Sequence, residues 1–153
     1  MRCLEHKIPP PVIGMIIGFV MWRCAAYGPV FALDVSIRNS VAACLFGVAL
    51  SCDFAALLAF RAAQTTINPL APARASKLVT TGIYKITRNP MYLGLCLILL
   101  AWALHLSAWL SFMGPVLFVL YITRFQIQPE ERVLQQHFGE VYAAYTARVR
   151  RWL

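Results

Sequence analysis

Two polar segments interrupt an otherwise apolar sequence, and they hold the residues that could do chemistry. Residues 78–94 carry Arg88 with two tyrosines, two glycines and a proline, and residues 129–142 open on a proline and two glutamates. A guanidinium group binds carboxylate or phosphate oxygens through paired hydrogen bonds, so Arg88 suits an anionic group. An apolar chain has little reason to keep two such segments unless chemistry takes place there.

Each segment can also be read as nothing more than the start of a helix. Asn89 is a good helix cap and Pro90 fits the first helical position, while Pro129 followed by acidic residues favours a first turn. Against this reading, Arg88 places a cation at the positive end of a helix dipole, where an anion is expected to balance it. The tyrosines of the two segments suit either a binding site or a membrane-interface belt: Tyr84, Tyr92, Tyr142 and Tyr145.

Composition indicates what must position these residues. The chain has 153 residues, of which 60% are hydrophobic and only 13% charged, whereas soluble domains are about 45–50% apolar and about 25% charged. We therefore expect one integral membrane domain, residues 1–153, of the all-α class. The net charge of +8 is attributed to cytoplasmic loops near anionic lipids and not to nucleic acid. The cysteines form no CxxC pair, and no metal site is expected.

The apolar runs predict about four membrane-spanning helices, the last two forming a hairpin around residue 106. Residues 34–40 are expected to form a polar turn and residues 61–89 a long loop. In this loop the pairs Asn68-Pro69 and Ala71-Pro72 are expected to prevent helix formation. Gly114 and Pro115 predict a kink, and residues 126–153 predict an amphipathic helix at the cytoplasmic surface. The expected spans are residues 12–33, 41–60, 90–106 and 108–125.

Charge predicts the topology. If both termini and the 61–89 loop share one side, every Lys and Arg except Arg23 and Arg38 lies there, and that side is cytoplasmic. The chain is then an integral membrane protein with both polar segments on one face, where they can form one site. Arg23 and Asp53 fall within apolar runs, and we expect a structural ion pair between them more readily than a substrate role.

The motifs of the two segments resemble those of one enzyme family. Residues 78–84 read LVTTGIY and residues 88–94 read RNPMYLG, with EE at 130–131, FG at 138–139 and VRRW at 149–152. This combination is similar to that of the isoprenylcysteine carboxyl methyltransferases, which belong with the small phospholipid methyltransferases of membranes. The resemblance runs from about Thr65 to the C-terminus, so residues 61–153 would be the cofactor-binding part and residues 1–60 a two-span N-terminal part.

The resemblance implies S-adenosylmethionine as the methyl donor, S-adenosylhomocysteine as the product, and a lipophilic or lipidated acceptor in the membrane. Arg88 would face the polar head of the acceptor or the carboxylate of the donor, and Glu130 would meet the donor's ammonium group. These two are the candidate catalytic residues. The donor pocket would be lined by Leu78, Val79, Tyr84, Asn89, Pro90, Met91, Tyr92 and Glu130.

One departure from the family pattern concerns the acceptor. The eukaryotic enzymes have His where this chain has Asn89, and an amide cannot act as a base. Bacterial relatives with Arg-Asn-Pro are known, so the resemblance implies a protein of a bacterial inner membrane. A carboxylate acceptor needs no base at neutral pH, whereas an amine acceptor would need one, for which Glu130, Glu131 and the tyrosines are candidates. Because Arg88 suits an anionic group, a carboxylate or another anionic head is favoured. Two alternatives stay open, namely a membrane reductase of the sterol reductase type that binds NADPH, and a membrane scaffold without activity.

Overall fold

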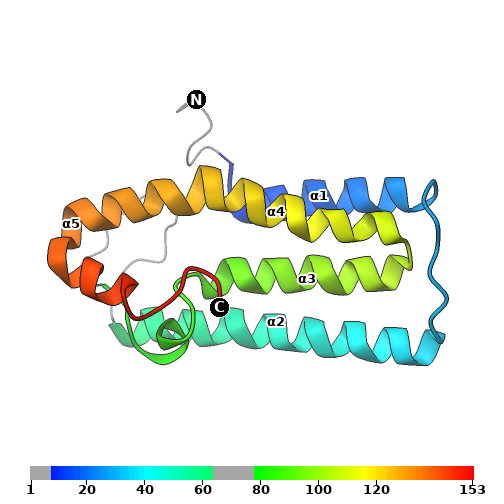
Figure 1. The fold of residues 1–153 in the computed structure, drawn as a ribbon. Coiled ribbons are helices and arrows are strands. Elements are labelled where there is room, and N and C mark those ends of the chain that lie inside the picture. Colours follow the sequence, from blue (N-terminus) through cyan, green and yellow to red (C-terminus); the bar gives the residue numbers. More distant parts are fainter. Residues whose placement is uncertain (1–7, 64–77) are drawn as a thin grey trace.

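The computed structural model describes residues 8–63 and 78–153, and this part of the chain is helical without a β-strand (Figure 1). The predicted all-α class is confirmed. The predicted stops at Pro69 and Pro72 lie outside the described residues. The main helices are α1 (Pro10–Ala25), α2 (Val35–Ala63), α3 (Pro90–Leu106), α4 (Met113–Ile122) and α5 (Gln128–Thr146), with short 3-10 turns η3 (Gly82–Lys85) and η4 (Trp109–Phe112) and a π-helical turn η5 (Thr123–Ile127).

Helix α3 is the centre of the bundle, because α1, α2 and α4 all pack against it. The buried core lies between these helices and includes Leu99, Ala103 and Phe118. The outward faces are also apolar: Phe19, Phe54 and Leu120 are each at least 60% exposed. A bundle that is apolar inside and outside is typical of a protein that is solvated by lipid.

Two helices are long and apolar enough to cross a membrane, and they support membrane association. One is α2, with 29 residues, and the other is the continuous helix Trp109–Thr146, with 38. The second includes α4 and α5 and bends at Gly139, within α5.

The hairpin prediction is confirmed. Helix α3 covers residues 90–106 as predicted and stops at Ser107, which adopts a left-handed conformation with φ 56°. The chain then reverses through η4 into α4. The predicted kink at Gly114 and Pro115 is wrong, because these residues lie in the first turn of α4, where a proline removes no helical hydrogen bond.

The first two helices differ from their predicted ranges. Helix α1 ends at Ala25 and not near residue 33, and α2 begins at Val35 and not near residue 41. The cause is Asp34, whose Oδ1 accepts hydrogen bonds from the backbone amides of Ser36 and Ile37 at 2.9 and 3.1 Å. A residue expected in a polar turn is therefore a helix cap that extends α2 by six residues.

The predicted ion pair between Arg23 and Asp53 is also wrong. Arg23 lies in the last turn of α1, above the Trp22 ring. Asp53 lies 18 residues along α2 from the same end of the bundle, about 27 Å away along the axis, and faces Gly94 of α3. The two charged residues therefore lie at different heights along the bundle axis and on different helix interfaces.

Candidate active site

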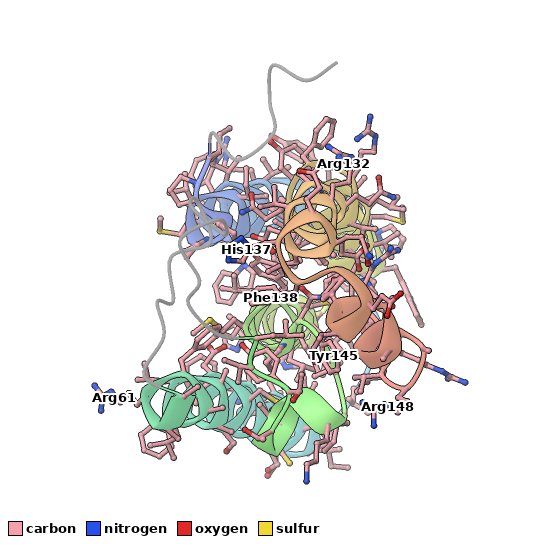
Figure 2. All side chains as sticks on the ribbon, turned by 90° about the vertical axis from the view of Figure 1, so that its left-hand side faces the viewer. Arg61, Arg132, His137, Phe138, Tyr145 and Arg148 are labelled. Carbon is pink, nitrogen blue, oxygen red and sulfur yellow. The ribbon has the colours of Figure 1, made fainter. Side chains whose placement is uncertain are left out.

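The two polar segments meet at one end of the bundle. The start of α1, the end of α2, the start of α3 and the whole of α5 lie at this end (Figure 1). Seen along the bundle, α5 runs from α4 down past the end of α3, with Phe138 and Tyr145 on its inner side, while Arg61 of α2 and Arg148 project away (Figure 2). The sequence-based expectation that both segments share one face is thus met in the fold.

Glu130 connects the second segment to the first. Its Oε1 accepts a hydrogen bond from the Tyr92 hydroxyl at 2.6 Å and another from the Gln126 side-chain amide at 2.9 Å. Burial raises the pKa of the Glu130 carboxyl to about 7, although both hydrogen bonds act in the opposite direction. Both of these donors are neutral, and among the residues that the structure describes no ion pair to this acid is seen.

Glu131, the next residue, has the opposite environment. Arg151 binds its carboxylate with two nitrogens, Nη2 at 2.7 Å and Nε at 3.0 Å, and Arg88 Nη2 lies 3.2 Å from the same carboxylate. Two guanidinium groups share one carboxylate, so this pair of contacts keeps one excess positive charge. The anion expected to balance Arg88 is therefore supplied by the protein itself.

Arg88 retains an unused donor. Its side chain is 13% exposed, and its Nη1 lies 3.4 Å from the Tyr142 hydroxyl. Its Nε is buried and makes no hydrogen bond within the described part of the chain. A buried donor without an acceptor is uncommon in folded proteins and costs free energy, so this nitrogen is a natural contact for an anionic ligand.

The C-terminal residues hold the first segment in place. The carbonyl of Arg150 accepts from the Arg88 amide at 3.1 Å, and that of Arg151 accepts from Asn89 Nδ2 at 2.9 Å. Asn89 occupies the cap position of α3 but makes no side-chain cap bond, so its predicted capping role is wrong. Pro90 does occupy the first turn of α3, as predicted.

The second helix start, predicted at Pro129, agrees with α5, which begins at Gln128 and has Pro129 and both glutamates in its first turn, although no loop precedes it. Helix α4 continues into α5 through η5 without a break. A proline ring clashes with the carbonyl four residues earlier in a regular α-helix, and the wider π-helical turn just before Pro129 relieves this clash. The same turn contains Gln126, which contacts Glu130.

The remaining predicted site residues lie around this polar network. Tyr84 is buried against Val79, with Met91 at the edge of the same cluster, and Leu78 packs on the cluster formed by Tyr142 and Tyr145. Burial raises the pKa of the Tyr84 hydroxyl above its ordinary value. The Tyr145 hydroxyl, whose pKa burial raises to about 12, donates to the Tyr84 carbonyl at 2.7 Å.

A bend in α5 brings these tyrosines into position. Gly139 has φ 52° and ψ −125° inside the helix, a conformation that side-chain-bearing residues rarely adopt. The bend turns the last part of α5 back over η3, so that Tyr142 reaches Arg88 and Tyr145 reaches Tyr84. Sequence reasoning found Gly139 only through the family motif.

The structure thus brings Arg88, Asn89, Tyr92 and Glu130 into a polar network of two hydrogen-bonded groups, which are joined through the adjacent residues Glu130 and Glu131. The other predicted residues lie beside this network. Sequence reasoning missed Gln126 and Arg151 as members of the network. Arg151 is part of the C-terminal motif VRRW, but the sequence did not indicate that Glu131 is its partner. Among the described residues, no group of three metal-ligating side chains comes together.

Comparison with known proteins identifies the family. A model described as phospholipid methyltransferase matches residues 37–141, which is more than half of the chain and includes most of the network. The chain belongs to the phospholipid methyltransferase family. The suspected resemblance is therefore confirmed, and the family suggests methyl transfer to lipid-like substrates.

Two relatives show how far the similarity extends. The chain is 51% identical over 63 residues, 41% of its own length, to an uncharacterised protein of Haemophilus influenzae that is matched over its whole length. It is 36% identical over 77 residues to the protein-S-isoprenylcysteine O-methyltransferase B of Arabidopsis thaliana. That match covers 48% of this chain and 37% of the plant protein.

Proposed function

We propose that this chain transfers a methyl group from S-adenosylmethionine to a lipophilic acceptor with an anionic head, at the cytoplasmic face of the membrane. The observation that carries the proposal is the junction of the two segments, where Tyr92 and Arg88 of the first contact Glu130 and Glu131 of the second. The proposal keeps the predicted arrangement of four spans with both termini in the cytoplasm.

The residues present fit this donor. Glu130 is a buried acid whose hydrogen-bond donors within the described residues are both neutral, and the ammonium group of S-adenosylmethionine would supply a cation. Tyr84, which interacts electrostatically with Glu130, belongs to an apolar cluster with buried Val79 and partly buried Met91, and such a cluster suits the flat adenine ring. When bound, the donor supplies a methyl group that is already activated on a sulfonium, so the protein has to position the partners and exclude water.

Arg88 is the group that would meet the acceptor or the donor's carboxylate. Its Nε is an unused buried donor, and the contacts among Arg88, Arg151 and Glu131 retain one positive charge. A carboxylate acceptor suits this site because it is already ionised at neutral pH. The name of the plant relative, an isoprenylcysteine O-methyltransferase, supports the same class of acceptor.

A thermal-shift experiment on the detergent-purified protein tests the proposal against its alternatives. S-adenosylmethionine and S-adenosylhomocysteine are expected to raise the melting temperature, because ligands that bind the folded state stabilise it, whereas NADPH should not. A shift with NADPH alone would support the reductase alternative. No shift with any of the three, in protein that melts cooperatively, would support the scaffold.

A further inference from the structure

A second feature of the fold lies away from the candidate active site. Helices α1 and α2 both pack on α3, and between them they leave an apolar groove of 720 Å³ that is floored by α3. Phe19 of α1, Ala43 and Phe46 of α2, and Leu99 and Trp102 of α3 line it. In a membrane such a groove is filled by lipid or by another protein helix.

The length of the groove favours a single acyl chain. Its lining runs from Pro11 to Trp22 on α1 and from Leu95 to His105 on α3, which corresponds to about 15–17 Å of helix. This is the hydrocarbon depth of one leaflet, half of the roughly 30 Å in a bilayer.

The charges at one end of the groove favour an anionic headgroup. His105 and Asn39 line the end remote from Glu130. The next residue, Arg38, donates to the Ser107 hydroxyl with one nitrogen, while its Nε is buried without a hydrogen bond in the described part of the chain. Arg23 follows Trp22 at the same end, and Asp34 is the acid nearby, held as the cap of α2.

These two arginines are the cations that topology leaves on the side opposite the other Lys and Arg residues. Cations are disfavoured on that side of a bacterial membrane, and Arg23 and Arg38 are the sequence neighbours of Trp22 and Asn39, which line this end of the groove. An anionic phosphate there would accept hydrogen bonds from Arg38 and offset its charge.

We propose that the groove between α1 and α2 binds one anionic phospholipid of the leaflet opposite the candidate active site, with an acyl chain along α3 and its phosphate at Arg38. The proposal does not depend on methyl transfer. It differs from a binding site for the methyl acceptor, whose reacting head must lie at the Glu130 end of the bundle.

Native mass spectrometry of the delipidated protein tests this proposal, with an equimolar mixture of dioleoyl phosphatidylglycerol and dioleoyl phosphatidylcholine. The acyl chains of the two lipids are identical, so any preference reports the headgroup. We expect one phosphatidylglycerol per chain to be retained in preference. Arg38→Gln should reduce that preference about tenfold, as expected for one charge-assisted hydrogen bond, and Arg38→Lys should keep most of it.

Two controls are matched to the variants. Arg61→Gln removes a cation from the other end of α2 and should leave the preference unchanged. Ala43→Phe fills the groove and should abolish retention of both lipids, whereas Val48→Phe adds similar bulk to an exposed position of α2 outside the groove lining and should not. The proposal is overturned if the wild type retains both lipids equally, if Arg61→Gln acts like Arg38→Gln, or if Ala43→Phe releases a second copy of the chain instead of lipid.

Discussion

At the scale of single residues, two adjacent glutamates have different electrostatic environments. Glu131 is paired with two guanidinium groups, whereas Glu130 is buried among neutral hydrogen-bond donors. Neighbouring acids placed in contrasting environments commonly divide roles within a site. Here the contrast assigns Glu131 to holding the two segments together and leaves Glu130 for a cationic ligand.

This assignment predicts a pH dependence of donor binding. With the pKa of Glu130 at about 7, the carboxyl is mostly neutral at pH 6 and mostly ionised at pH 8. Only the ionised form pairs with an ammonium group, so affinity for S-adenosylmethionine should rise about tenfold over that range. Glu130→Gln should lose about 1.5–3 kcal/mol of binding free energy at pH 8 and show a flat profile. Equal profiles for wild type and variant in titration calorimetry would remove Glu130 from the donor site.

The folding stability of the unliganded protein should fall as the pH rises, whereas the affinity for S-adenosylmethionine should rise. The folded-state pKa of Glu130 is raised above its ordinary value of 4.5, so its contribution is most favourable below pH 4.5 and is lost as the pH rises through 7. Glu130→Gln carries no such charge. At pH 8 we expect the variant to melt at a higher temperature than wild type, and at pH 5 the difference should shrink.

Arg88 is expected to act on turnover more than on folding. Arg88→Gln should lower methyl transfer about 10²-fold or more, the usual effect of removing a hydrogen-bond donor aimed at a reacting group. Arg148→Gln is the matched control, because Arg148 projects away from the bundle (Figure 2). Full activity of Arg88→Gln would show that Arg88 only joins the segments.

At the scale of elements, the bend in α5 brings the second segment over the first. Gly139→Ala adds a Cβ that meets no atom within 4 Å, so its cost comes from the positive φ of 52° alone. We expect a loss of about 1–3 kcal/mol in unfolding free energy together with weaker donor binding. Gly47→Ala, in the interior of α2 and also free of contacts, should instead stabilise by about 0.5–1 kcal/mol. Equal effects of the two changes on melting would contradict this account of the bend.

The contact between α2 and α3 depends on a different glycine. A Cβ at Gly94 would lie 2.5 Å from Asp53 Oδ1 and 3.1 Å from the Ala49 carbonyl, so the helices must move apart to admit it. Gly94→Ala should cost about 1–3 kcal/mol. At Gly18 the nearest atom would be 3.8 Å away, and Gly18→Ala should be tolerated. Unchanged melting of Gly94→Ala would show that the helices separate easily.

Local chemistry explains which elements could be predicted from the sequence. Helix α3 was predicted over its full range, because local residues determine both of its ends: Pro90 at the start and Ser107 just after the last residue. Asp34 was misread because a capping acid and a turn acid look alike until the amides that it binds are known. The tolerance of Pro129 depends on the π-helical turn before it, which no local pattern indicated.

At the scale of the whole molecule, errors arose wherever contacts between distant elements decide the outcome. Arg23 and Asp53 were paired because both are charges in apolar helices, but α1 and α2 meet through α3 and not through each other. Arg151 reaches Glu131 only because the chain folds back after α5. Hydropathy and charge predicted that the two segments lie at the same end of the bundle. Which side chains contact one another there depends on tertiary packing.

The central claim is that both segments build one site for S-adenosylmethionine. Its most direct test is a double-mutant cycle of binding free energies by titration calorimetry at pH 8, with Tyr92→Phe in the first segment and Glu130→Gln in the second. We predict one donor per wild-type chain, a loss in each single variant, and a double variant whose loss is smaller than the sum by about 0.5–3 kcal/mol. Unchanged affinity in both single variants, or losses that simply add, would contradict the single shared site.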